Sequence, residues 1–252
     1  MYKLLTIFFI LLFTVPSFSA EKPTDSATNM EFVFVKGGCF QMGDTFGDGS
    51  SNEKPVHEVC VDDFYIGKYE VTQGQWKAIM GNNPSRFSDC GDNCPVESAS
   101  WNDIQDFINK LNQKTGKNYR LPTEAEWEYS ARSGGKNEKY AGTSNESELG
   151  DYAWYISNSG GKTHPVGTKQ PNGLGIYDMS GNVWEWVSDW YDADYYKNSP
   201  KDNTKGPSSG SARVLRGGSW SNGAWDTRIA LRYWGYPVGW GNHGGFRLVR
   251  TQ

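Results

Sequence analysis

The sequence lacks a surplus of basic groups, because 25 lysines and arginines stand against 29 aspartates and glutamates, for a net charge of −4. Proteins that follow nucleic-acid phosphates carry a basic surface, so we expect no nucleic-acid partner. The 30 glycines show no triplet period, which excludes a collagen-like fibre. Hydrolase, phosphate-loop, dinucleotide and zinc-protease motifs are also missing. Composition therefore removes these functional classes before any single residue is considered.

Aromatic residues and glycines are abundant instead. The chain carries 11 tryptophans, 14 tyrosines and 12 phenylalanines, which is enough apolar surface to build a core. Many aromatics together with many glycines favour irregular packing with long loops over a helix bundle. We find no internal repeat and no linker that would divide the chain. The sequence predicts a single α+β domain over residues 31–252.

The first twenty residues have the layout of a secretory signal peptide. Lys3 precedes the apolar segment 4–15, and small residues follow up to Ala20. This segment is too short for a membrane span, although an uncleaved anchor is the alternative. We expect residues 1–20 to be removed and 21–30 to be a flexible lead-in. The mature protein is then exported to a periplasmic or extracellular space, without a transmembrane anchor.

An exported chain with an even number of cysteines favours disulfides. Cys39 and Cys60 lie in strand-like segments that can be neighbours, and Cys90 and Cys94 flank a short loop that contains a glycine. We therefore predict the pairs Cys39–Cys60 and Cys90–Cys94 among the three pairings that are possible. A zinc site is the competing interpretation, and no cysteine and histidine cluster with ligand spacing supports it.

Helix caps and apolar periodicity predict three helices. Thr72 and Ser100 can cap the first two, which stop at Gly81 and Gly116, and the third begins at 122–123 and stops near 134–135. Alternation predicts strands within 32–35, 39–43 and 56–69. Helical periodicity ends after residue 135, so the remainder should consist of turns and short strands, with an exposed loop at 203–212.

Residues 172–189 combine glycines, carboxylates and tryptophans. Glu185 lies between Trp184 and Trp186, so its carboxylate should be buried and must have a counter-charge or several donors. Arg216 or Arg247 could form a bidentate pair with it. A calcium ion held together with carbonyl oxygens of the preceding turn is the other possibility. The residues alone leave the two alternatives open.

Basic residues gather in the last forty positions of a chain rich in carboxylates. They are Arg213, Arg216, Arg228, Arg232 and Arg247. We interpret them as structural partners of buried carboxylates, with a pocket for an anion or a peptide backbone as the alternative.

Four motifs occur in an order that resembles the formylglycine-generating enzyme family, the sulfatase-modifying factors. They are Arg120-Leu-Pro-Thr-Glu-Ala-Glu-Trp-Glu128, Gly181-Asn-Val-Trp-Glu-Trp186, Arg216-Gly-Gly-Ser-Trp220 and Gly245-Phe-Arg247. The segments 40–43 and 68–72 also match, so the similarity covers about residues 31–250. The resemblance implies an irregular C-type-lectin-like fold with structural calcium. One calcium site would be formed by the carbonyl groups of Ser180, Gly181 and Val183 and the carboxylate of Glu185.

The catalytic residues of that family do not carry over. The resemblance implies that members oxidise a cysteine of a sulfatase peptide with oxygen and a copper ion held by two cysteines. The matching positions here are Asn222 and Thr227. An amide and a hydroxyl cannot replace the thiolates that copper(I) prefers, so we do not expect copper. We expect no catalytic residue for formylglycine formation.

Two functional hypotheses follow from this comparison. The first is a calcium-stabilised monomer that binds a peptide, glycan or protein in the family cleft, with Ser219, Trp220, Asn222 and Trp225 as contact residues. The second is an oxidoreductase that modifies a cysteine or thiol of a peptide substrate. We favour the first, because the second requires a thiolate nucleophile or metal ligand. A purely structural envelope protein is a third possibility.

Overall fold

A computed structural model describes residues 28–239 and 241–250 of the chain. The predicted signal peptide, 1–20, and most of the lead-in, 21–30, lie outside these residues. Within the described part, no helix has the length and apolar character needed to cross a membrane.

The three predicted helices are confirmed. They are α1 (Gln73–Met80), α2 (Trp101–Thr115) and α3 (Glu124–Ala131). The side chains of Thr72, Ser100 and Thr123 each accept a hydrogen bond from a backbone N–H of the first helical turn. The first two helices end at Gly81 and Gly116 in the left-handed conformation. The third ends a few residues earlier than the glycines at 134–135 suggested.

The strands are short and form three sheets. One sheet has the order β1 (Phe32–Val35), β4 (Phe64–Gly67), β10 (Val249–Arg250) and β5 (Tyr119–Arg120). A two-stranded sheet pairs β2 (Gly38–Met42) with β3 (His57–Val61). The third has the order β8 (Tyr233–Gly235), β7 (Arg213–Arg216), β6 (Trp184–Trp190) and β9 (Gly244–Gly245).

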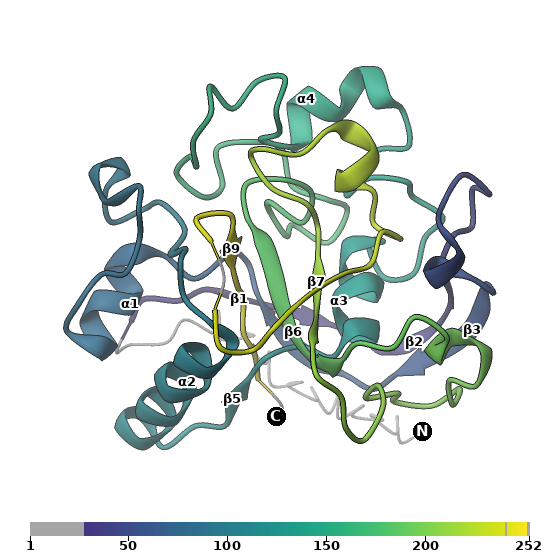
Figure 1. Ribbon diagram of the computed structural model, residues 1–252, viewed down its shortest axis with the longest axis horizontal. Helices are drawn as coiled ribbons and strands as arrows, with labels where there is room; N and C mark the ends of the chain where they lie inside the picture. The colour runs from purple at the N-terminus through teal and green to yellow at the C-terminus, as the bar shows by residue number, and fades with distance from the viewer. Residues whose placement is uncertain (1–27, 240, 251–252) are drawn as a thin grey trace, which may run out of the picture.

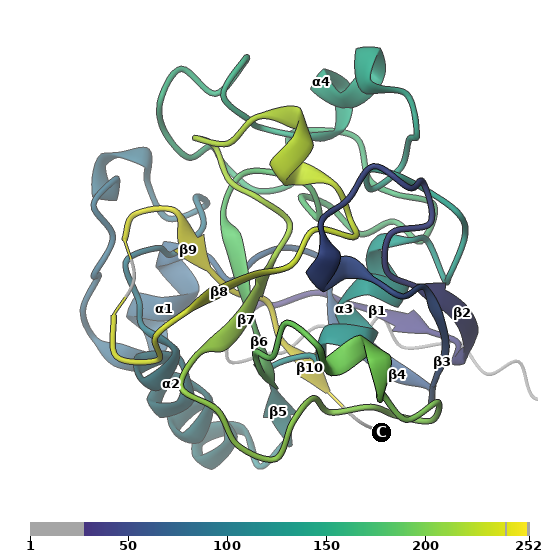
Figure 2. The ribbon, with the colours of Figure 1, turned by 45° about the vertical axis from the view of Figure 1, so that its right-hand side comes forward.

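The third sheet holds the centre of the molecule. In Figure 1, β6 and β7 run through the middle, with α1 and α2 on one side and β2 and β3 on the other. Figure 2 shows β8 and β9 beside them. After residue 135 the only α-helix within the described ranges is the one-turn α4 (Leu149–Tyr152). Turns and loops account for most of this half, as the loss of helical periodicity predicts.

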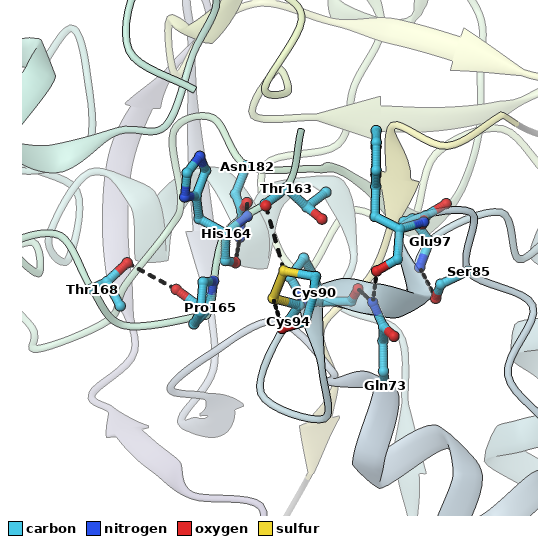
Figure 3. Close-up of a disulfide and its surroundings, with 12 residues drawn as sticks. Gln73, Ser85, Cys90, Cys94, Glu97, Thr163, His164, Pro165, Thr168 and Asn182 are labelled. Carbon is cyan, nitrogen blue, oxygen red and sulfur yellow. Dashed lines mark hydrogen bonds between the residues drawn. A yellow bond between two sulfur atoms is a disulfide. The ribbon is translucent and has the colours of Figure 1, made fainter. Parts of the chain in front are cut away.

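Both predicted disulfides are present. Cys39 and Cys60 are direct partners across β2 and β3, and Cys90 is bonded to Cys94. In Figure 3 the second disulfide lies between the start of α1 and the segment that carries Thr163 and His164. The carbonyl of Cys94 accepts a hydrogen bond from Gln73 N at 2.8 Å, so this loop caps the helix.

Buried arginines attach the C-terminal third of the chain to the rest. Arg232 forms two hydrogen bonds to Glu124 of α3, at 2.7 and 2.9 Å, although 108 residues separate them. Burial alone would raise the pKa of Glu124, but Arg232 and Arg216 hold it below its usual value. Arg228 binds Glu53 in the same bidentate manner, at 2.8 and 3.0 Å. The interpretation as structural partners of buried carboxylates is confirmed for Arg216, Arg228, Arg232 and Arg247. Arg213 instead donates to the carbonyl group of Ser188 and lies over Trp190.

Arg216 and Glu128 form the most enclosed of these pairs. Both side chains are fully buried, and Glu128 also accepts a hydrogen bond from Arg132 Nε at 2.9 Å. The Arg216 guanidinium donates as well to the carbonyl groups of Ile229 and Leu231, at 2.8 and 2.7 Å. One side chain thereby fixes both the strand β7 and the loop that precedes β8.

We expect removal of the two disulfides to destabilise the protein by different amounts. Cross-linking stabilises mainly by restricting the unfolded chain, and this effect grows with the length of the closed loop. Cys39→Ala with Cys60→Ala should lower the free energy of unfolding by about 3 kcal/mol, and Cys90→Ala with Cys94→Ala by about 2 kcal/mol. Urea denaturation of the three proteins under non-reducing conditions measures both values. An equal loss of the free energy of unfolding for the two disulfides, or a greater loss for Cys90–Cys94, would contradict the expected dependence on loop length.

Candidate functional site

Glu185 is buried and paired with an arginine. Arg247 Nε donates to its Oε2 at 2.7 Å and Arg247 Nη2 donates to its Oε1 at 2.6 Å. Trp127 Nε1 also donates to Oε2, at 2.7 Å. Arg216 is the cross-strand neighbour of Glu185 in the β6–β7 register, yet it turns to Glu128 instead. Of the two arginines that the sequence suggested, the structure uses Arg247.

Two further carboxylates lie near this pair. Glu70 accepts hydrogen bonds from Asn182 Nδ2 at 2.6 Å and from the backbone N–H of Val183 at 3.1 Å. Burial, together with the charges of Asp178 and Glu185, raises the pKa of Glu70 well above its usual value. Burial also raises the pKa of Asp178 to about 6. The group therefore contains more carboxylates than cations, and this surplus favours the protonated form of Glu70.

The predicted calcium ligands Ser180, Gly181 and Val183 lie in the turn before β6. Gly181 has φ +83° and packs so closely on Trp154 that a Cβ atom would lie 2.3 Å from its carbonyl oxygen. The carboxylate that should complete the set already has protein partners in this arrangement. Both oxygens of Glu185 are engaged by Arg247 and Trp127, so an ion would have to share the carboxylate with a guanidinium. The calcium site stays a prediction.

The predicted contact residues differ in how far they are buried. Ser219 is fully buried, and its hydroxyl donates to Asn222 Oδ1 at 2.6 Å, so Ser219 positions Asn222 and cannot itself contact a ligand. Trp220 is half-buried, packs edge-to-face on Phe87 and donates from its indole nitrogen to Asn242 O. Trp225 is 47% exposed. Thr227, at the second copper-ligand position, is buried and its hydroxyl donates to Ala224 O at 2.9 Å.

Asn222 lines a small pocket of about 170 Å³. The other described lining residues come from four parts of the chain, namely Trp184, Ser221 with Asp226, Tyr233 and His243. Burial lowers the pKa of His243, which favours the neutral form of its ring. The pocket lies where the 3-10 turn η5 (Ala224–Thr227), the start of β8 and the approach to β9 meet.

Exposed aromatic side chains border this pocket. Trp225, Tyr233, Trp234 and Tyr236 have exposed fractions between 41% and 57%, and we call these four residues the aromatic face. The rings of the last three form a chain of contacts, with centroids 6.5 Å apart for Tyr233 and Trp234 and 5.6 Å apart for Trp234 and Tyr236. Tyr233 also stacks on the buried Trp184 at 5.2 Å. Clustered exposed aromatics are typical of binding surfaces.

The sequence predicted Trp225 of the aromatic face as a contact residue. It did not indicate the other three aromatic residues, nor Asp226 and His243 of the pocket. A signal was present, because Tyr233, Trp234 and Tyr236 lie within four positions between buried arginines. It could not be interpreted alone, since aromatic residues in a loop are as often buried as exposed. The edge position of β8 exposes them (Figure 2).

Comparisons with known proteins agree with the motifs. The family described as the sulfatase-modifying factor enzyme 1-like domain matches residues 17–252. A curated relative, the chaperone protein LppX of Paenibacillus barcinonensis, is 33% identical over 98% of this chain and 99% of its own length. The formylglycine-generating enzyme of Streptomyces coelicolor is 32% identical over 75% of this chain and 78% of its own.

A solved structure shows the same fold. Treponema denticola variable protein 1 superposes with a TM-score of 0.81 and is 35% identical, covering 88% of this chain and 95% of that protein. The predicted α+β fold is therefore confirmed, with helices and short strands arranged as in these relatives.

We expect Glu185→Gln to lower the free energy of unfolding by about 3–5 kcal/mol, because it removes the charge from the carboxylate that forms the bidentate pair with the buried guanidinium of Arg247. Glu58→Gln is the matched control, since it breaks an exposed pair with Lys201 and should cost less than about 0.5 kcal/mol. Chemical denaturation measures both changes.

The same variant tests whether a calcium ion binds at the Glu185 carboxylate. If Glu185 serves only Arg247 and Trp127, the parent melts at the same temperature in chelator and in added calcium. A calcium-dependent rise in the melting temperature of the parent that Glu185→Gln abolishes would instead place an ion at this carboxylate.

Proposed function

The chain belongs to the sulfatase-modifying factor enzyme 1-like family, and on that premise we propose that it is an exported, non-catalytic member that binds a peptide, glycan or protein ligand through its aromatic face. Export rests on the signal-peptide layout of residues 1–20 and on the even number of cysteines. The observation that carries the binding role is the exposure of four aromatic side chains beside a pocket, three of which contact one another in series.

The thiol chemistry of formylglycine formation has no residues to perform it here. The sequence contains four cysteines, and all four are consumed by the two disulfides. Thr227 has its hydroxyl bonded to the backbone, and Asn222 has its carbonyl oxygen bonded to Ser219. Neither side chain offers the soft ligand that copper(I) requires, and neither is a nucleophile comparable to a thiolate.

The aromatic face has the properties of a binding surface on a rigid support. Tyrosine and tryptophan provide a large contact area with few rotatable bonds, so little entropy is lost when a ligand covers them. The backbone beneath them is held by Arg228, which binds Glu53, and by Arg232, which binds Glu124. These ion pairs thus fix the positions from which the exposed side chains of the face project.

We expect Trp234→Ala combined with Tyr236→Ala to abolish ligand binding without unfolding the protein. Both side chains are exposed, so the melting temperature should change by no more than a few degrees. Binding should weaken at least about tenfold, because aromatic contacts dominate such interfaces. Phe46→Ala is the matched control, since Phe46 is 42% exposed and lies in the loop between β2 and β3, outside the aromatic face.

Peptide and glycan arrays probed with the purified mature chain supply the ligand, and titration of that ligand against the three proteins gives the affinities. Equal binding by the double variant and the parent would contradict the proposed role of the aromatic face. Copper-dependent oxygen uptake with a cysteine-containing peptide would contradict the non-catalytic assignment and favour the thiol-modifying alternative.

A further inference from the structure

The pocket beside the aromatic face is small enough to limit what it can hold. Its volume is about 170 Å³, whereas pockets for drug-sized ligands have roughly 300–1,000 Å³. A peptide or an extended lipid chain would fill it with one group only and would lie mostly outside. A single six-membered ring with its substituents matches this space.

The residues that line the pocket provide both a hydrogen-bond donor and a hydrogen-bond acceptor. Asn222 Oδ1 accepts hydrogen bonds from the backbone N–H and hydroxyl of Ser219, at 3.1 and 2.6 Å, which fixes the plane of the amide. Its Nδ2 group makes no hydrogen bond to the described part of the protein and remains a donor for a ligand. Asp226 keeps one carboxylate oxygen as an acceptor, because only Oδ2 accepts from the backbone N–H of Gly223. Sugar hydroxyls both donate and accept, so they can use both groups.

The charge of the pocket excludes anions. Asp226 contributes a negative charge, and none of the six described lining residues is a lysine or an arginine. A sulfate, phosphate or carboxylate group would therefore approach a carboxylate without a compensating cation, which is unfavourable at such short range. Neutral or cationic ligands remain.

The aromatic walls favour the neutral ligand. A quaternary ammonium group is usually bound inside a cage of several ring faces. Here Trp184 and Tyr233 stack on each other, with centroids 5.2 Å apart, and the other four described walls are polar. An ammonium group without hydrogen-bond capacity would leave the Nδ2 group of Asn222 desolvated and without a hydrogen-bond acceptor, which costs free energy. One aromatic wall beside polar side chains suits the apolar C–H groups and the hydroxyls of a sugar ring.

We propose that this pocket binds one neutral sugar ring, a hexose or N-acetylhexosamine in its pyranose form, so that the ligand of the aromatic face is a glycan whose terminal residue enters the pocket. This inference rests on the proposed function and narrows its ligand to one chemical class.

Saturation-transfer-difference NMR with the mature chain tests it. The probes are D-glucose, D-galactose, D-mannose and N-acetyl-D-glucosamine, with N-acetylneuraminic acid and choline as the anionic and cationic comparisons. We expect at least one neutral sugar to bind with a dissociation constant of about 1–10 mM, as is usual for a single small ring. We expect no binding of N-acetylneuraminic acid or choline at the same concentrations.

Two variants locate the binding. Asp226→Asn keeps the shape of the side chain and should weaken the sugar at least about fivefold, because it replaces a charged acceptor by a neutral one. Phe46→Ala is the matched control: Phe46 is 42% exposed but belongs neither to the aromatic face nor to the lining of the pocket, so the single sugar should bind as it does to the parent. Unchanged melting temperatures of both variants show that any loss is local.

The outcomes separate this inference from the proposed function. Binding of choline or N-acetylneuraminic acid in place of the neutral sugars, or a sugar signal that Asp226→Asn leaves unchanged, overturns the sugar pocket. Absence of any sugar signal overturns it as well. In each of these cases an array ligand that is lost in the Trp234→Ala and Tyr236→Ala double variant would still uphold the aromatic face as a binding surface.

Discussion

Pairing of buried guanidinium groups with buried carboxylates is the constraint on which the rest of this structure depends. A charged side chain without water must find an opposite charge and further hydrogen-bond partners, and few geometries satisfy both demands. Arg216, Arg228, Arg232 and Arg247 are all nearly or fully buried, and each is bound to a glutamate from a distant part of the sequence. These pairs fix where the C-terminal third of the chain lies, although it contains little regular secondary structure.

Because of the same constraint, the residues that hold the fold together differ from those that can contact a ligand. Along residues 213–247 the buried arginines alternate with exposed or half-exposed residues, and only the latter line the pocket or form the aromatic face. A side chain of this second group can be exchanged without leaving a buried charge unpaired. Under the proposed function, the family scaffold keeps a well-defined surface for another ligand, while Asn222 and Thr227 stand where the resemblance places two cysteines.

Features set by neighbouring residues could be predicted from the sequence, whereas contacts between distant segments could not. Capping residues and a stop glycine defined α1 and α2, because these signals act within a few residues. The disulfides followed from export and strand alternation. The arginine that pairs with Glu185 could not be predicted, because Arg216 and Arg247 carry the same side chain. Only the direction in which each side chain leaves the backbone decides which of them reaches the carboxylate. The burial of Ser219 and the exposure of Tyr233 depend in the same way on packing between distant segments.

Hydrogen–deuterium exchange on Glu124→Gln tests most directly whether the ion pairs hold the ligand-bearing segment. Glu124 is the carboxylate of Arg232, which lies next to Tyr233 of the aromatic face. The account predicts faster exchange for backbone amides of residues 228–236 in the variant than in the parent, with unchanged exchange in α2. Unchanged exchange in residues 228–236, or an equal rise throughout the protein, would contradict it.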